Sequence, residues 1–391
     1  MIDSSAGSIR IIGKSTSAYG VYVPASSVES PGGTVEIVGA GGVEIRGEST
    51  AGDGVNLSRT EIRSADRNVS ITGKSVAGIG LNLSYGLTGV DRTTVSSGTG
   101  RMELTGDTAS VSEPGLALGD VTLGGAAQVQ SGDIILRARN GGSADSIKLY
   151  YIDDGEVPIT HQASVQTTGS LVFVPGGLNG FNPESADDVA IGVGTSTGSG
   201  FELDPGDLLA IGAGGSVVVG SDTHTGQIST SPSGLVLNSN LTLQNEGSGS
   251  LGISFGGLNV AGHTLTLASA GPLVQAFGGP VVADAFLVRA TRAADVQLTK
   301  YPNSVNTLAV DPPAAFAFVN AGPITIGPVS GLGFSTGTGA VQVLTAANSS
   351  SFGDFFVRTL SGSITLGQNI TTLDPGSNIT LVSATNFIND G

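Results

Sequence analysis

The segment GSIRIIGKSTSAYGVYV, residues 7–23, returns three times within the first third of the chain. The later copies are GGVEIRGESTAGDGVNL at 41–57, RNVSITGKSVAGIGLNL at 67–83 and, more loosely, GRMELTGDTASVSEPGLAL at 100–118. Each copy contains a short alternating strand, a glycine, a Ser/Thr-rich bend, a second glycine and a second short strand. Self-similarity at this spacing is typical of solenoids, in which each unit buries its apolar side only by stacking on its neighbours.

Four marker glycines set the spacing of the repeats. Gly13, Gly47, Gly73 and Gly106 lie 34, 26 and 33 residues apart. We interpret the 26-residue spacing as one coil, and the 34-residue spacing as the same coil with an extra strand, GGTVEIVGA at 32–40. Alternating residues predict strands in which apolar side chains point inward and polar ones outward. In this section the pattern predicts the strands Ser8–Ile12, Thr34–Val38, Val43–Arg46, Val69–Thr72, Met102–Thr105 and Asp133–Arg137.

The composition fits an ordered chain of strands and turns. Of the 391 residues, 62 are Gly, 39% are hydrophobic and only 12% are charged. This apolar content is too high, and the charge too sparse, for a disordered chain. Val, Ile, Leu and Ala are interrupted every few positions by Gly, Ser, Thr or Asn, which is the punctuation of short strands.

Three sections follow from this pattern. Residues 1–140 contain the regular coils, residues 141–235 have longer loops and more carboxylates, and residues 236–391 return to short strands. Within 281–301, which lacks Gly and Pro, we predict two strands rather than a helix. The strands predicted for the last section are Leu241–Leu243, Leu265–Leu267, Phe286–Val288, Val296–Leu298, Ile324–Ile326, Val341–Val343, Ile364–Leu366 and Ile379–Leu381.

The charge of the chain is strongly acidic and unevenly distributed. The formal net charge is −16. Between Leu149 and Val288 there is no Lys or Arg, while 12 carboxylates fall in that stretch. Such a surface repels nucleic acid and anionic lipid, so we expect neither as a partner. We also expect no membrane insertion, because no run approaches the ~18 apolar residues of a membrane span.

Four segments together resemble the filamentous-haemagglutinin-like exoproteins of bacterial two-partner secretion. They are the bends GKSTSAYGVYV, GESTAGDGVNL and GKSVAGIGLNL; the block from SLVFVPGGLNG at Ser170 to VVVGSDTHTGQI at Ile228; LTLASAGPLVQAFGGPVVADAFLVRA at 265–290; and the tail GSITLGQNITTLDPGSNITLVSATNFINDG. Their order and density carry the resemblance, which reaches from near the start of the chain to its end.

The resemblance implies a fold, a route of export and a function. The implied fold is an all-β, right-handed parallel β-helix forming one elongated rod. The implied function is that of an adhesin, secreted or held at the bacterial cell surface, with a role in biofilm or virulence. Export would use an outer-membrane pore partner, and the receptor would be a host-cell or matrix glycan or protein.

The absence of cysteine mildly favours export. MIDSSAGSIR has no secretory signal and the Asn-Pro-Asn signature of the secretion domain has no match, so we expect a stretch of a longer array.

Three carboxylate clusters are the sharpest candidates for chemistry. They are Asp153, Asp154 and Glu156; Glu184, Asp187 and Asp188; and Glu202, Asp204 and Asp207. Hard oxygen ligands suit Ca²⁺, which makes Asp153, Asp154, Asp187 and Asp188 candidate calcium ligands. A polysaccharide-acting β-helix enzyme could also use such carboxylates, but a lyase needs a nearby Lys or Arg, and this stretch has none. The simpler interpretation is that all three clusters lie on solvated turns, so we expect no enzyme and no required cofactor.

The remaining polar motifs carry less information. His161, His224 and His263 are far apart and the chain has no Cys, which argues against zinc and for turn positions. GTSTG at 194–198 and GFSTG at 333–337 match a nucleophile-elbow pattern, which has meaning only between a strand and a helix. Chance matches are expected in a chain this rich in Gly, Ser and Thr.

Aromatic and amide side chains suggest weak glycan contacts. Tyr150 and Tyr151 border the acidic section, and tyrosine rings commonly stack on sugars. Tyr19 and Tyr22 occupy the positions that hold Asp53 and Asn56 in the next repeat. Asn56 and Asn82 are also equivalent, as GVNLS and GLNLS, and could form an external amide ladder or sites of glycosylation. Three hypotheses therefore stay open: an adhesive rod, a polysaccharide-acting enzyme, and a passive spacer that carries a toxin or binding tip lying elsewhere.

Overall fold

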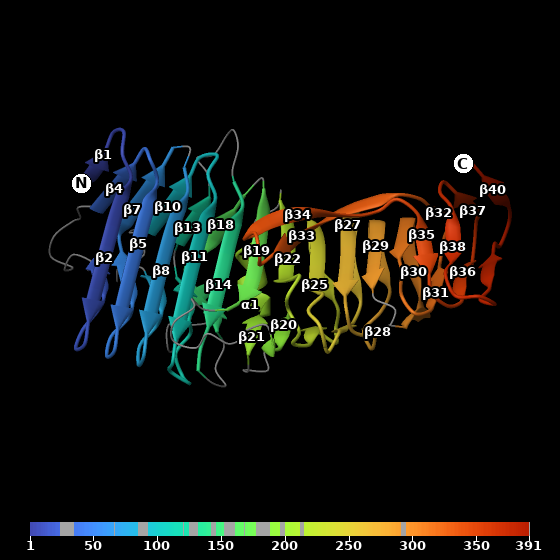
Figure 1. The fold of residues 1–391 in the computed structure, drawn as a ribbon, viewed down its shortest axis with the longest axis horizontal. Coiled ribbons are helices and arrows are strands. Elements are labelled where there is room, and N and C mark those ends of the chain that lie inside the picture. The colour runs from blue at the N-terminus through green and yellow to red at the C-terminus, as the bar shows by residue number, and fades with distance from the viewer. Residues whose placement is uncertain are drawn as a thin grey trace. The chain divides into compact units, whose positions relative to one another are not determined.

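Parallel strands in stacked sheets make up nearly all of the regular structure (Figure 1). The computed structural model describes residues 1–23, 35–65, 67–84, 93–119, 121–124, 132–141, 146–151, 161–167, 169–176, 188–195, 200–211, 215–290 and 295–390. The chain divides into two compact units, one of residues 1–186 with 195–215 and one of residues 187–194 with 216–391. The expected all-β parallel architecture is confirmed.

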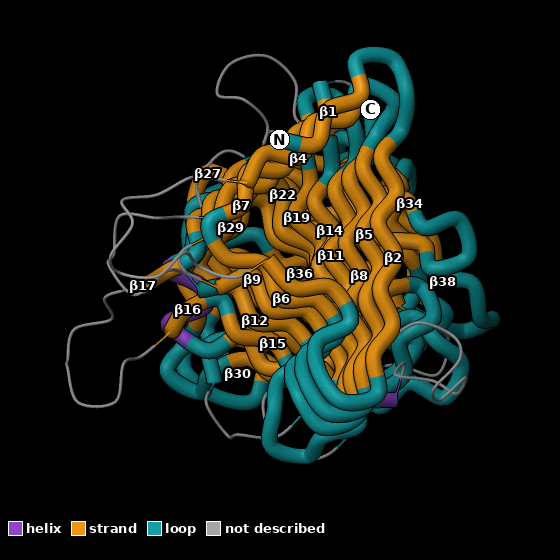
Figure 2. Tube along the Cα trace, turned by 90° about the vertical axis from the view of Figure 1, so that its left-hand side faces the viewer, coloured by secondary structure: helices purple, strands orange, loops and turns teal. Residues whose placement is uncertain are grey.

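In the first unit the chain adds one strand to each of three parallel sheets in turn, and Figure 2 shows these strands one behind another. The first sheet contains β1 (Ile2–Ser4), β4 (Val35–Gly39), β7 (Thr60–Ser64), β10 (Thr93–Ser97), β13 (Val121–Gly124) and β18 (Ser164–Gln166). The second contains β2 (Ile9–Ser15), β5 (Val43–Ser49), β8 (Val69–Ser75), β11 (Met102–Thr108), β14 (Ile134–Arg139) and β19 (Ser170–Pro175). The third contains β3 (Val21–Val23), β6 (Val55–Ser58), β9 (Leu81–Ser84), β12 (Leu116–Leu118) and β15 (Ile147–Lys148).

The repeats stack with equivalent residues side by side. Gly13 pairs with Gly47 and Gly47 with Gly73, so the marker glycines form a column along the second sheet. Along β5, buried and more exposed residues alternate, as expected for Val43–Arg46. Inward Ile45 and Ile71 have 0% exposure. Because the inward residues of successive coils form such columns, one coil buries its apolar side chains only against the next coil.

One part of the repeat interpretation is wrong. The strand in GGTVEIVGA is not extra, because β4 pairs in register with β7 and each pass of the chain contributes a strand at this place. The longer repeat differs instead in the length of its connection. β3 ends at Val23 and β4 begins at Val35, whereas β6 ends at Ser58 and β7 begins at Thr60.

The marker glycines are required by a close approach between chain segments. A Cβ atom on Gly47 would collide with the carbonyl oxygen of Gly54, the second glycine of the same repeat. The same collision pairs Gly73 with Gly80. The bend between the two strands therefore folds back on the first strand so tightly that only hydrogen fits there.

The second unit continues the parallel pattern with longer strands. One sheet contains β20 (Ile191–Val193), β23 (Ile228–Thr230), β26 (Ile253–Phe255), β28 (Leu273–Gln275), the start of β30 (Val296–Asp311), β31 (Phe316–Asn320), β36 (Phe355–Thr359) and β39 (Ile379–Val382). Another contains β22 (Ser216–Ser221), β25 (Asn240–Asn245), β27 (Leu258–Ser269), β29 (Val281–Ala290), the end of β30, β32 (Ile324–Ile326), β37 (Ile364–Leu366) and β40 (Phe387–Asn389).

Short pairs complete the second unit. β24 (Leu235–Val236) pairs with the start of β27, and β35 (Ser349–Ser351) pairs with β38 (Ile370–Thr372). The prediction of strands rather than a helix within 281–301 is confirmed by β29 and β30. Inward phenylalanines pack in sequence, with Phe316 and Phe355 rings 5.2 Å apart.

One hairpin departs from the parallel stack. β33 (Val329–Ser335) pairs antiparallel with β34 (Ala340–Ala346). The sequence predicts Val341–Val343 as one more short strand of the last section. The segment is a strand, but it lies in this antiparallel hairpin. Figure 1 shows the hairpin as an orange ribbon crossing the strands of its own unit.

Helix is almost absent from the described residues. α1 (Pro205–Leu209) has five residues and follows β21 (Phe201–Leu203). Within these same residues, no helix has the length and apolar character to cross a bilayer.

Candidate binding surfaces

The third carboxylate cluster is structural rather than solvated. Asp204 caps α1 by accepting a hydrogen bond from the Asp207 backbone N–H at 2.9 Å, and the Asp207 side chain accepts one from the Asp204 N–H at 3.0 Å. Asp207 also accepts from Leu149 N–H at 2.6 Å. Asp207 has 0% exposure and Glu202 2%. The expectation of a solvated turn is therefore wrong for these residues, since Asp204 and Asp207 accept hydrogen bonds from backbone N–H groups and Glu202 is buried.

The calcium candidates are not brought together in the described residues. Asp153, Asp154 and Asp187 lie outside them, and Asp188 is exposed. Among the residues that the structure describes, no group of three His, Asp or Glu side chains could hold a metal ion. Calcium binding at these four aspartates stays a prediction.

The tyrosines at the border of the acidic section lie on a small separate pair of strands. Tyr150 and Tyr151 form β16, which pairs antiparallel with β17 (His161–Gln162). The structure describes the backbone of this pair. A glycan contact at the two rings stays a prediction.

The first repeat presents an aromatic pair beside polar side chains of the next two repeats. Tyr19 and Tyr22 stack with ring centroids 4.4 Å apart, and both rings are exposed. Tyr22 is in register with Asn56, and Asn56 with Asn82. Parallel neighbours lie about 4.8 Å apart, so the tyrosines adjoin the amides on one face of the third sheet.

The predicted amide ladder has a carboxylate at its centre. The Asn56 and Asn82 amides both donate to Asp53 Oδ2, at 2.7 and 3.1 Å, rather than to one another. The Ile79 backbone N–H donates to Asp53 Oδ1 at 3.0 Å. Asp53 thus fixes two neighbouring coils. We name the residues Tyr19, Tyr22, Asp53, Asn56 and Asn82 the tyrosine–amide face.

The outer face of the second sheet is a lattice of opposite charges. Register aligns Lys14 with Glu48, Glu48 with Lys74, Lys74 with Asp107 and Asp107 with Arg139. The Lys14 ammonium lies 3.0 Å from Glu48. Burial lowers the pKa of Lys74 and raises the pKa of Asp107, and the attraction between the two opposes both shifts.

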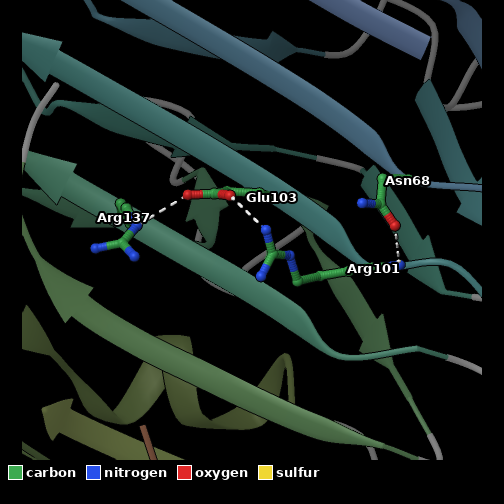
Figure 3. Close-up of polar contacts among 4 residues, drawn as sticks. All are labelled: Asn68, Arg101, Glu103 and Arg137. Carbon is green, nitrogen blue, oxygen red and sulfur yellow. Dashed lines mark hydrogen bonds and ion pairs between the residues drawn. The ribbon is translucent and has the colours of Figure 1, made fainter. Parts of the chain in front are cut away.

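A further group of opposite charges on this sheet is drawn in Figure 3. Glu103 lies between two guanidinium groups, with Arg137 Nε at 3.0 Å and Arg101 at 3.6 Å. Asn68 accepts a hydrogen bond from the Arg101 backbone N–H at 3.0 Å. These groups neutralise one another, so the lattice contributes more to holding coils in register than to attracting a charged ligand.

A groove in the second unit was not anticipated from the sequence. The cavity, of about 580 Å³, is lined by Pro272, Leu273, Val274, Gln275, Asp295, Gln297, Thr299 and Lys300. These residues lie on, or directly before, β28 and the start of β30, where buried and exposed side chains alternate. Hydroxyl, amide, carboxylate and ammonium groups therefore meet over apolar side chains, a mixture that suits small polar ligands.

Two aromatic rings lie beside the Lys300 ammonium group of this groove. Lys300 Nζ lies 5.6 Å from the centre of the Phe277 ring and 5.5 Å from that of Tyr301. It also donates to the Ala276 carbonyl oxygen. Phe277 is 61% exposed and offers ring surface beside the groove. No sequence motif marks this site, because it arises from residues that only the stacking brings together.

His224 also differs from the expectation of a simple turn residue. Its side chain has 0% exposure, whereas His263 is half-buried and contacts Asn238 at 3.1 Å. GFSTG at 333–337 spans the end of β33 and the hairpin bend, so it is not a nucleophile elbow between a strand and a helix.

Comparison with known proteins returned no relative. No protein-family model matches the chain, no curated protein sequence matches it, and no solved structure matches its fold.

Proposed function

We propose that this chain is part of a secreted bacterial surface adhesin of the filamentous-haemagglutinin-like kind, and that its coils close into a right-handed parallel β-helix. The observation that carries this proposal is the strict rotation of the first unit's chain among three parallel sheets, with equivalent residues of successive coils in register. A stacked scaffold of this type presents the same surface position repeatedly, which favours many weak contacts over one tight site.

The tyrosine–amide face and the groove are the surfaces on which we expect contact with a glycan receptor. Exposed rings offer apolar area for sugar faces, while amides and carboxylates exchange hydrogen bonds with hydroxyls. The proposed adhesin reaches the cell surface through an outer-membrane pore partner and acts in biofilm formation or virulence. A net charge of −16 makes nucleic acid an unfavourable partner.

A replacement experiment tests the adhesive function. In the full-length adhesin, residues 1–391 are exchanged for an unrelated β-solenoid of equal length, which keeps the spacing of the flanking parts. Loss of bacterial attachment to host cells, with surface display unchanged by antibody staining, supports the proposal. Full attachment of the exchanged protein would make the chain a passive spacer.

One observation favours a polysaccharide-acting enzyme as the second candidate. On the outer face of the second unit, Arg289 Nε lies 3.3 Å from Glu246 and 3.7 Å from Asp311. This supplies the basic residue beside carboxylates that a lyase requires and that sequence reasoning did not find. Incubation with uronate-containing polysaccharides, followed at the absorbance of unsaturated products, tests it. Turnover lost in R289A would favour the enzyme, and no turnover of any substrate would remove it.

A further inference from the structure

The β33–β34 hairpin covers an apolar patch on the outer face of its unit. Val329, Leu344 and Ala346 of the hairpin pack against side chains of three parallel strands, which are Ala268 of β27, Leu287 of β29 and Ala309 of β30. These three residues occupy outward-facing positions of their strands. In the first unit, outward-facing positions of the second sheet carry the charge lattice instead. The sheet is therefore apolar where the hairpin covers it.

Close backbone contacts hold the body of the hairpin. A Cβ atom on Gly331 would collide with the Thr266 side chain, and one on Gly333 would lie 2.9 Å from Gln244 Oε1. Gln244 Oε1 instead accepts a hydrogen bond from the Phe334 N–H at 2.7 Å. The two glycines thus let the hairpin lie directly on the sheet.

The tip of the hairpin is fastened to the turn that follows β22. Asp222 N–H donates to the Phe334 carbonyl at 3.0 Å, and Asp222 Oδ1 accepts from Thr336 N–H at 2.8 Å and from its hydroxyl at 3.1 Å. The hydroxyls of Thr223 and Thr336 share a hydrogen bond of 2.9 Å. These contacts join the tip of the hairpin to Asp222 and Thr223, the two residues before His224.

His224 is the ionisable group inside this turn. Its side chain has 0% exposure, and neither ring nitrogen makes a well-formed hydrogen bond among the described residues. Burial lowers the pKa of His224 to about 4, a shift that the nearby Asp188 carboxylate and a weak backbone interaction with Gly226 oppose only in part. A buried imidazole with so little polar support is tolerated when neutral and strongly disfavoured when charged.

We propose that the β33–β34 hairpin is a strap that acid releases at its tip, through protonation of His224 in the turn that fastens it. Opening the turn lets water reach the charged ring, and the same opening breaks the contacts of Asp222 and Thr223 with Thr336. Release would uncover the apolar patch of Ala268, Leu287 and Ala309. The inference concerns a conformational device and does not depend on the proposed adhesive function.

Apart from His224, the ionisable groups described near this turn are carboxylates and one arginine, and none of them lies on the hairpin. Residues 329–346 contain no Asp, Glu, His, Lys or Arg, so the hairpin itself has no ionisable side chain. The carboxylates on the segments packed near the turn are Asp188 before β20, Asp222 in the turn itself and Glu246 after β25, which is paired with Arg289. Protonation of Asp222 would also weaken the fastening, and the experiment separates that route from protonation of His224.

The direction of the pH dependence follows from the lowered pKa. The opened turn binds a proton near the ordinary histidine pKa of 6.5, whereas the closed turn binds it only near 4. Closure is therefore fully favoured above pH 6.5 and is lost progressively as the pH falls toward 4. Between these limits the population of the open strap rises roughly tenfold for each pH unit, because one proton is bound on opening.

Thiol labelling measures the opening directly, because the chain has no cysteine. Ala346→Cys places a single thiol on the face of the strap that packs against the sheet, at a position with 4% exposure. Ala283→Cys, also 4% exposed but outside the apolar patch, is the matched control. Both are labelled with dithiodipyridine, which reacts with thiols in acid, from pH 7 to pH 4. Each is made in the wild-type background and in a His224→Gln background, where the turn cannot titrate at this residue.

If the strap opens in acid through His224, only A346C with His224 intact should label faster as the pH falls. The same variant with H224Q should show a flat rate, and A283C should stay slow throughout. A flat rate for A346C with His224 intact overturns the proposal. Equal acceleration with H224Q would assign the release to a carboxylate instead, and parallel acceleration of A283C would mean general unfolding. Both results also overturn it.

Discussion

Ile45 shows at the scale of one residue how the stack obtains its stability. It lies at an inward position of β5, between the equivalent Ile11 and Ile71 of the neighbouring coils, and has 0% exposure. Burial of such a side chain contributes about 1.5–3 kcal/mol, and each one depends on coils on both sides. Its position could be predicted from alternation alone.

The substitution Ile45→Asp should open several coils of the first unit. A carboxylate at this position would be buried with no partner, which costs about 4 kcal/mol or more. We expect earlier thermal unfolding and new protease cleavage sites among residues 35–84. Arg46→Asp, at the exposed neighbouring position, is the control. Unchanged protease resistance of I45D would contradict the stacked core.

Substitution of Gly47 tests the close approach that explains why glycine recurs at this position of the repeat. Gly47→Ala places a methyl group against the Gly54 carbonyl and should reduce the free energy of unfolding by about 1–3 kcal/mol, as overpacking does. Gly322→Ala is the matched control, since a Cβ at Gly322 meets no atom within 4 Å. Equal stability of the two variants in urea unfolding would show that the contact is not tight.

Sequence reasoning found some polar contacts of single residues and missed others. The equivalence of Tyr22, Asn56 and Asn82 follows from aligning repeats, and the register confirms it. That both amides bind Asp53 could not be predicted, because the choice of partner depends on side-chain rotamers. The burial of His224 was missed for a related reason: its turn is covered by parts of the chain distant in sequence.

At the scale of elements, strands were predictable and their partners were not. Alternation located β5, β8 and β11, since inward and outward residues differ in polarity. The antiparallel pairing of β33 with β34 over the sheet leaves no separate mark in the sequence. The supposed extra strand at 32–40 was misassigned because the length of a connection resembles an inserted element.

Disulfide formation between neighbouring strands tests the register. Glu44 and Ser70 face outward in register on β5 and β8, about 4.8 Å apart in a parallel sheet, which is within disulfide range. Thr72 is two residues along β8 and about 8 Å from Glu44, beyond that range. E44C/S70C should therefore crosslink rapidly on oxidation, and E44C/T72C should not. Equal rates in the two pairs on gel mobility would contradict the register.

At the scale of the whole molecule, we propose that a repeated scaffold presents surfaces for contact with glycans. The scaffold was predictable from four copies of one segment, because stacking makes sequence repetition into columns. The candidate binding surfaces were only partly predictable from the sequence. The groove between β28 and β30 joins residues 272–275 to residues 295–300, which no local pattern connects.

Direct binding of the chain to cells tests the proposal that this scaffold is itself adhesive. Beads coated with the 391-residue chain are counted on cultured epithelial cells, with heat-unfolded chain and the double variant Y19A/Y22A as comparisons. We expect that the folded chain binds, that soluble chain competes, that unfolding abolishes binding, and that Y19A/Y22A or F277A reduces binding severalfold through lost ring contacts. Binding of folded chain no greater than that of unfolded chain would contradict the proposed adhesive function.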